Sequence, residues 1–273
     1  MRTLRLASVA VTAAVLVSGL TACGSDGKAG TKAAGDAAPG KALELDPKAA
    51  LAASALVMQK FGNGSVELVL PEDTMAGAAQ WKQGTDLDLT GRGKATTKVR
   101  VLGDDVYLGS AEKTAGAGGK HWAKVGPKDK LIGPMAGMFL TTAQVTNPVL
   151  QLTVAAQTGS PAKVGPETVG GAQTTHYHAV EDAAKITEAL AALGADQRAA
   201  VQQTLAVSGN TLTVDFWINA KQELVQLREY GDKAGEKQAV TVTYSGLGSA
   251  PRIEAPAAAE VGSGADFSKI LGG

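Results

Sequence analysis

The sequence predicts an α+β fold whose sheet is largely antiparallel. Over much of the chain, apolar and polar side chains alternate, which is typical of strands with one face buried and the other in water. Segments with helix start signals and apolar residues at helical spacing precede and interrupt these runs. Gly-rich turns separate neighbouring runs. With 273 residues, the chain is long enough for one or two domains.

Charge and composition exclude several classes of protein. Lys and Arg together number 26, as do Asp and Glu, so the formal net charge is zero. A non-specific nucleic-acid binder would carry a basic excess, so no nucleic acid is expected as a partner. The hydrophobic content of 44% is too high for a disordered chain. The single Cys excludes an intramolecular disulfide and a multi-cysteine metal site.

Residues 1–22 are predicted to be an export signal. Arg2 and Arg5 form a positive start, and residues 6–20 are apolar or small without a charge. This run is too short for a membrane-spanning helix, which needs about 20 apolar residues. Leu-Thr-Ala-Cys at 20–23 matches the bacterial lipobox, in which Cys23 receives a diacylglycerol and begins the mature chain. The alternative is an ordinary signal peptide with an incidental Cys, but acylation also accounts for the lone thiol.

Residues 23–45 are predicted to be a flexible tether. They are mostly small or polar and show neither a helical nor a strand period. About 22 such residues reach roughly 25 Å. Two or three acyl chains on Cys23 should anchor the protein stably, because a single chain binds a membrane only reversibly. The expected location is the outer face of the cell membrane.

The folded region is predicted to begin with a helix after residue 45. Asp46 is a good N-cap, and Pro47 suits the first helical position. Gly62 and Gly64 are expected to end the helix. Its apolar stripe consists of Leu51, Ala55 and Met58, with Leu56 beside them.

A meander of strands is predicted next. Turns are expected at 91–93 and 103–105, and a Gly-rich loop at 112–120. The residues that share the buried parity in these strands are Val66, Leu68 and Leu70; Trp81, Thr85, Leu87 and Leu89; Val99 and Val101; and Val106 and Leu108.

The second half alternates between helices and strands. Residues 131–154 are apolar in runs broken by Gly-Pro and Asn-Pro, which predicts two short helices. Strands are expected at 162–169 and 173–180, followed by a helical pair over 181–205 that is broken at Gly194. The last predicted strands span 211–218, 224–230 and 238–244. Residues 257–273 are expected to be a small-residue tail.

This order of elements resembles the LolA-like lipoprotein superfamily. The strand Gln-Thr-Thr-His-Tyr-His at 173–178 and the hairpin from 213–219 into 223–225 carry the likeness. The chain most resembles actinobacterial lipoproteins of the LppX and LprG type. A Gly turn and a Trp before an Asn turn are typical of these proteins, and the Gly pair at 170–171 and the Trp-Ile-Asn at 217–219 fit this pattern. The resemblance implies that residues 46–256 form a strongly curved antiparallel sheet, a half-barrel, capped by helices around an apolar core or cavity. It also implies binding or transport of lipids or acylated molecules.

Motifs of enzymes and cofactor sites are missing from the sequence. There is no Gly-x-Ser-x-Gly elbow, no phosphate-binding loop of the Gly-Lys-Ser/Thr type, and no Gly-x-Gly-x-x-Gly after a strand. We therefore expect no enzyme, no catalytic residue and no cofactor. His176 and His178 face one side of a strand and, with His121, would suit zinc, but they also fit a solvated sheet face, and no metal is predicted. Glu181 and Asp182 are interpreted as charges at a helix N-terminus.

Two further clusters each allow two interpretations. The basic stretch could contact anionic headgroups or be a solvated loop and edge strand. Its residues are Lys120, His121, Trp122, Lys124, Lys128 and Lys130. A second group, made of Met135, Met138 and Phe139, could be an adaptable lid over a cavity or plain core.

The predicted function is that of an anchored envelope lipoprotein that binds or carries a lipophilic ligand in an apolar cavity. The alternative is a lipid-anchored, non-catalytic structural or interaction module whose core is filled by its own side chains. The residues expected to line the cavity are Val66, Leu68, Leu70, Trp81, Leu87, Leu89, Val99, Val101, Tyr177, Leu212, Val214, Phe216 and Ile218.

Overall fold

The structure has the predicted α+β architecture. It is a computed structural model that describes residues 45–92, 97–110, 118–129, 132–190 and 193–270. The chain divides into two units, residues 1–43 and 44–273, and all described residues belong to the second. Cys23 and the predicted export signal lie outside the described residues, as does the tether up to residue 44.

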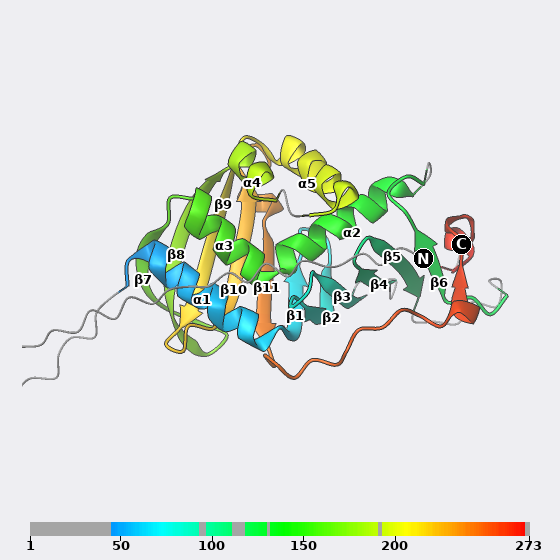
Figure 1. Cartoon of the computed structure of the whole chain (residues 1–273), viewed down its shortest axis with the longest axis horizontal. Coiled ribbons are helices and arrows are strands. Elements are labelled where there is room, and N and C mark those ends of the chain that lie inside the picture. The colour runs from blue at the N-terminus through cyan, green and yellow to red at the C-terminus, as the bar shows by residue number, and fades with distance from the viewer. Residues whose placement is uncertain (1–44, 93–96, 111–117, 130–131, 191–192, 271–273) are drawn as a thin grey trace, which may run out of the picture. The chain divides into compact units, whose positions relative to one another are not determined.

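The described residues form one curled, open sheet of twelve strands (Figure 1). Its order is β12-β6-β5-β4-β3-β2-β1-β11-β10-β9-β8-β7, and neighbours are antiparallel except for the parallel pair β12 and β6. The strands are β1 (Asn63–Val69), β2 (Thr74–Gln80), β3 (Asp86–Gly91), β4 (Thr97–Leu102), β5 (Asp105–Ser110), β6 (Trp122–Val125), β7 (Ala162–Val169), β8 (Ala172–Asp182), β9 (Thr211–Asn219), β10 (Leu224–Gly231), β11 (Val240–Ser245) and β12 (Val261–Gly262).

Helices cover one face of this sheet. In Figure 1, α1 and α3 lie across β8 to β11, whereas α2 continues toward β4 and β5, with α5 above it. The helices are α1 (Pro47–Phe61), α2 (Gly133–Thr146), α3 (Pro148–Thr158), α4 (Ala183–Ala189), α5 (Ala195–Ser208) and α6 (Phe267–Ile270). The two central helices and the helical pair predicted from the sequence are therefore confirmed.

The first helix begins and ends where the sequence predicts. The Asp46 side chain accepts a hydrogen bond from the backbone N–H of Ala49, and Pro47 is the first helical residue. Gly62 takes the left-handed conformation, with φ of 72°, and donates its N–H to Met58. Leu56 is 70% exposed, so it does not belong to the apolar stripe that enters the core.

The buried parity of most strands is also confirmed. Val66, Leu68, Leu87, Leu89, Val99 and Val101 all lie in the hydrophobic core, on the face that the helices cover. The strand β2 differs, since the sequence pattern does not predict a strand at 74–80. Trp81 and Thr85 fall in the connection between β2 and β3, where Trp81 is buried and donates its Nε1–H to the carbonyl oxygen of Met58 at 2.7 Å.

The segment expected to be a C-terminal tail is part of the fold. Val261 and Gly262 form β12, which pairs with Trp122 and Ala123 of β6. The short helix α6 follows and buries Ile270, which is 1% exposed. The folded unit thus extends beyond residue 256, because a few apolar residues among the Ala and Gly suffice to dock this segment.

The register of β9 allows a direct test of which of its residues face the core. Val214 is fully buried and lies opposite Glu229, whereas Thr213 is on the other face and half-buried. We expect Val214→Asp to lower the free energy of unfolding by roughly 3–5 kcal/mol, because it buries an uncompensated charge. Thr213→Asp should cost less than about 1 kcal/mol. Urea unfolding of both variants measures this, and equal losses would contradict the register.

Candidate ligand-binding site

An open groove runs between the helices and the sheet. Residues of α2 and α5 form one wall, and the ends of β9, β10 and β11 form the other. Its volume is about 350 Å³. Most of its surface is apolar, and its apolar side chains include Leu70, Met138, Phe139, Val145, Val207, Leu212 and Val240.

A smaller cavity continues from this groove into the protein. Its volume is about 50 Å³, and α3 and α4 help to close it. The two spaces are contiguous, because six residues line both. These shared residues are Thr141, Val145, Thr204, Ser208, Leu212 and Glu229.

Two glutamates face the inner cavity from neighbouring parts of the sheet. Glu181 on β8 lies opposite Leu212 on β9, and Glu229 on β10 lies opposite Val214. Both have the parity of core residues, because Ala179 precedes Glu181 by two positions and Leu227 precedes Glu229 in the same way. Glu181 is only 2% exposed, and its Oε1 has no hydrogen-bond partner among the described residues.

This placement corrects the interpretation of Glu181 and Asp182. Only Asp182 acts at the helix N-terminus, where its side chain accepts hydrogen bonds from the N–H groups of Ala184 and Lys185 at 2.8 and 3.3 Å. Glu181 is the last inward-facing residue before it. Adjacent positions of a strand point to opposite faces, so two neighbouring acids take different roles.

Burial changes the protonation of both glutamates. Desolvation, with a smaller contribution from the Glu229 carboxylate, raises the pKa of Glu181 from 4.5 to about 8. Burial raises the pKa of Glu229 from 4.5 to about 7. The helical residues that line the cavity are apolar or are Thr, Gln and Ser, and no Lys, Arg or His of the described chain lines it. Nothing cationic in the lining offsets the cost of ionising these carboxyls.

Most of the cavity residues predicted from the sequence pack elsewhere. Leu212 lines both spaces and Leu70 lines the groove, so these two belong to the site. The others are buried side chains that line neither the groove nor the inner cavity. They are Val66, Leu68, Trp81, Leu87, Leu89, Val99, Val101, Tyr177, Val214, Phe216 and Ile218. The hollow therefore occupies one end of the concave face rather than its middle.

The methionine cluster divides between surface and groove. Met138 is 52% exposed and lines the groove, and Phe139 lines it from a buried position. Met135 is partly exposed and is not among the groove residues. The lid interpretation thus fits Met138, because a flexible thioether at the mouth of an apolar groove adapts to different ligands.

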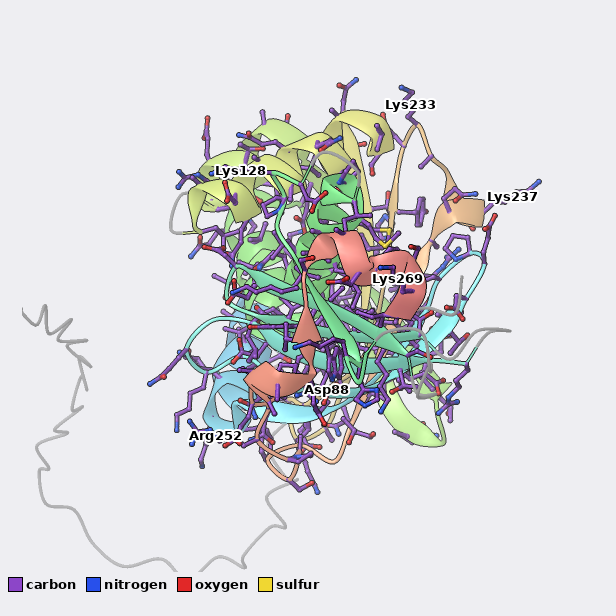
Figure 2. All side chains as sticks on the ribbon, turned by 90° about the vertical axis from the view of Figure 1, so that its right-hand side faces the viewer. Asp88, Lys128, Lys233, Lys237, Arg252 and Lys269 are labelled. Atoms are coloured by element: carbon purple, nitrogen blue, oxygen red, sulfur yellow. The ribbon has the colours of Figure 1, made fainter. Side chains whose placement is uncertain are left out.

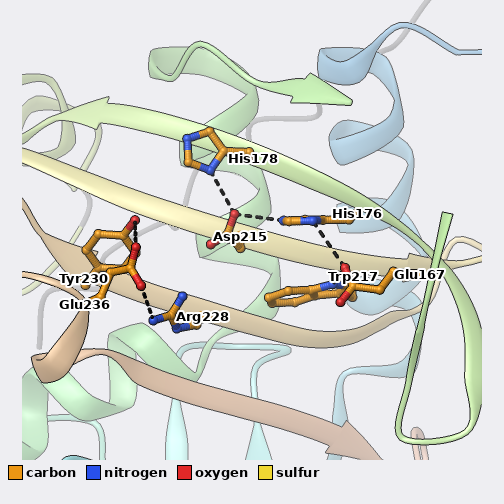
Figure 3. A network of polar contacts seen from close by, with 8 residues as sticks. All are labelled: Glu167, His176, His178, Asp215, Trp217, Arg228, Tyr230 and Glu236. Carbon is orange, nitrogen blue, oxygen red and sulfur yellow. Dashed lines mark hydrogen bonds and ion pairs between the residues drawn. The ribbon is translucent and has the colours of Figure 1, made fainter. Parts of the chain in front are cut away.

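The two histidines lie on the opposite, convex face of the sheet (Figure 3). His176 Nε2 and His178 Nδ1 each contact Asp215 Oδ1 at 2.9 Å. The His176 ring stacks on Trp217 with centroids 4.7 Å apart, and the Trp217 Nε1–H donates to Glu167 at 2.8 Å. These contacts bury Asp215 and Trp217 on a face expected to be wet. The described part of the chain contains no cluster of three or more His, Cys, Asp or Glu suited to a metal ion.

Within the basic stretch, the lysines contact groups of the same chain. Lys124 Nζ contacts Asp105 at 2.7 Å, and Lys120 Nζ donates to the carbonyl oxygen of Ala259 at 3.0 Å. Lys128, labelled in Figure 2, lies 3.6 Å from Asp196 of α5. Lys130 lies outside the described residues. The solvated-surface interpretation fits these contacts better than a headgroup site does.

The chain is similar to proteins of known sequence or structure. No protein-family model matches the chain. An uncharacterised 31.2 kDa protein of Streptomyces griseus is 31% identical over 183 residues, which are 66% of this chain and 59% of that protein. The match thus spans less than two thirds of the relative's length. In the described residues, no helix is long and apolar enough to span a membrane.

Two solved structures are similar in fold. LprF from Mycobacterium bovis is 16% identical, with 77% of this chain and 97% of that chain covered and a TM-score of 0.46. Lipoprotein LppX from Mycobacterium tuberculosis is 15% identical, with 76% and 98% covered and the same TM-score.

The glutamate pair predicts an unusual dependence of stability on pH. Because the folded-state pKa values lie above the ordinary 4.5, the folded protein binds more protons than the unfolded chain between pH 4.5 and 8. The contribution of the two protonated carboxyls to the free energy of unfolding is fully present below pH 4.5 and is lost as the pH rises through 7 and 8. The loss is on the order of a few kcal/mol.

Urea unfolding between pH 5 and 9 measures this effect as a difference between variants. Glu181→Gln and Glu229→Gln should flatten the decline relative to wild type. Glu188→Gln is the matched control, because Glu188 is an exposed residue of α4. Parallel curves for all four proteins would contradict the assignment.

Proposed function

We propose that the protein is a lipid-anchored envelope lipoprotein that binds a lipid or another lipophilic molecule in the groove beside α2 and α5. The observation that carries this proposal is an apolar groove of about 350 Å³ that continues into the core. Sites for small molecules typically have about 300–1,000 Å³ and mostly apolar walls. Binding of this kind needs no catalytic residue and no cofactor.

The mouth of the groove suits transfer from an apolar environment. Met138 and Val207 line it and are 52% and 65% exposed, so apolar side chains reach the solvent there. An acyl chain that enters between them replaces water at these surfaces and gains about 0.8 kcal/mol for each buried methylene. The resemblance to LolA-like lipoproteins implies the same class of ligand.

Acylation of Cys23 is the second part of the proposal. The lipobox supports it, and the tether of residues 23–45 would hold the folded unit at an average distance of roughly 25 Å from the membrane. The proposed location is the outer face of the cell membrane. A carrier held there meets lipids without first diffusing to the surface.

A filled interaction module is the competing function. It is favoured by the eleven predicted cavity residues that pack into the core instead of lining a hollow. In that case the groove is a surface irregularity, and the anchored unit binds proteins by its exterior. Ligand uptake distinguishes the two functions.

Uptake of a neutral lipophilic dye tests the groove. We expect Nile red to bind the mature chain and Val145→Trp to weaken binding about tenfold, because Val145 lines both spaces. The free energy of unfolding should fall by less than the roughly 1–3 kcal/mol that overpacking of a filled core would cost. Fluorescence titration and native mass spectrometry for co-purified lipid are the measurements.

The control for this experiment is Leu56→Trp on the exposed face of α1. It adds the same bulk away from the groove and should leave dye binding unchanged. Absence of dye uptake and of co-purified lipid in the parent protein would favour the filled module.

The anchor is tested separately by Cys23→Ala. This variant should lose acylation and either remain unprocessed or leave the membrane, because no thiol receives the diacylglycerol. Membrane fractionation and the mass of the mature chain measure the change. Unchanged partitioning and mass would refute the anchor.

A further inference from the structure

The inner cavity has the chemistry of a head-group site. We propose that it receives a hydrogen-bond-donating group of the bound ligand, a hydroxyl or an amine, between Glu181 and Glu229, while the apolar part of the ligand lies in the groove. This inference rests on the proposed function of the groove. It adds the class of ligand and the direction in which the ligand enters.

The size of the cavity favours a small polar group. A cavity needs only about 10–15 Å³ to hold a water molecule, so the 50 Å³ between the helices and the sheet is room for a small polar group. The groove is about seven times larger, at 350 Å³. The chain of a lipophilic ligand therefore fits the groove, and its head fits the cavity.

The hydrogen-bonding groups of the cavity call for a donor. Glu181 Oε1 is buried without a partner in the described structure, and a buried acceptor left unpaired costs about 1–3 kcal/mol. Two of the nearby hydroxyls already donate within the helices: Thr141 to Gly137 and Thr204 to Ala200, each at 3.1 Å. A ligand hydroxyl or amine supplies the missing donor.

The charges that face the cavity select against an acidic head. Glu229 faces Glu181 from β10, and the two carboxyls repel when both are ionised. The lining residues of α2, α3, α4 and α5 are uncharged. A carboxylate head would add a third acid to this set, whereas an ammonium would be the first cation.

The order of the two glutamates along the hollow sets the direction of binding. Glu229 lines both the groove and the cavity, whereas Glu181 lines the cavity alone. A polar head passes Glu229 first and ends at Glu181. The chain then remains against Phe139 and Val207 of the groove walls.

Three ligands with the same lauryl chain test the proposal. Lauryl alcohol, laurylamine and laurate are titrated below their aggregation concentrations against Nile red on the mature chain at pH 8. We expect the alcohol or the amine to bind about tenfold or more tightly than laurate, which corresponds to about 1.4 kcal/mol.

Substitutions at Glu181 distinguish the two donors. Glu181→Gln retains an acceptor and removes the charge. It should weaken the binding of laurylamine about tenfold and change the affinity for lauryl alcohol by less than about twofold. Glu181→Leu removes both the acceptor and the charge and should weaken the binding of either ligand. Glu188→Gln on α4 removes the same charge from an exposed site and should change nothing.

Two outcomes would overturn the proposal in different ways. If all three lauryl compounds bind within about twofold of one another while Nile red still binds, the head-group site is wrong and the groove function stands. If neither the dye nor any lauryl compound binds, the proposed function fails and this inference fails with it. Circular dichroism of each variant confirms that the chain is folded in both cases.

Discussion

Pairing of β1 with β11 is the contact on which the rest of the fold depends. It joins Ser65 to Ser245, and so connects the strands before the central helices with those after them. Side chains at this seam also hold the helices: Tyr244 on β11 donates its hydroxyl to the Thr146 carbonyl at the end of α2, and its ring packs edge-on against Trp81. Trp81 in turn donates to Met58 near the end of α1. The seam thus helps to fix both helices over the sheet.

The groove follows from how the helices meet the sheet at this seam. α2 crosses from the seam toward β4 and β5, and α5 packs against α2 rather than deep against the strands (Figure 1). The ends of β8 to β10 are thereby covered loosely, which leaves room beside Leu212. Two carboxyls at such a place reduce stability, because each must be desolvated and one oxygen lacks a partner. An apolar pair would pack better, so stability alone does not explain these glutamates.

Local signals in the sequence predict much of this fold. Asp46-Pro47 and Asn147-Pro148 mark helix starts, and Asn147 indeed accepts hydrogen bonds from Val149 and Leu150. Alternation predicts most strands because their faces differ in burial. β2 escapes this signal: its sequence Thr-Met-Ala-Gly-Ala-Ala-Gln contrasts little in polarity. Gly77 within it lies so close to β3 that a Cβ would overlap the carbonyl oxygen of Asp88, a tertiary constraint that no local pattern encodes.

The difference between local patterns and tertiary constraints also explains why the site is only partly predictable from the sequence. Alternation identifies which side chains point inward, and it did so for Leu212, Val214, Phe216 and Ile218. It does not tell whether an inward side chain meets another side chain or a hollow, because that depends on helices far away in the sequence. Polarity would have been the better signal. Glu181 and Glu229 share the parity of core residues, and an acid at a core position of a strand is costly wherever it occurs. A search for charged residues of buried parity, rather than for apolar ones, leads to the end of the sheet where the groove and the cavity meet.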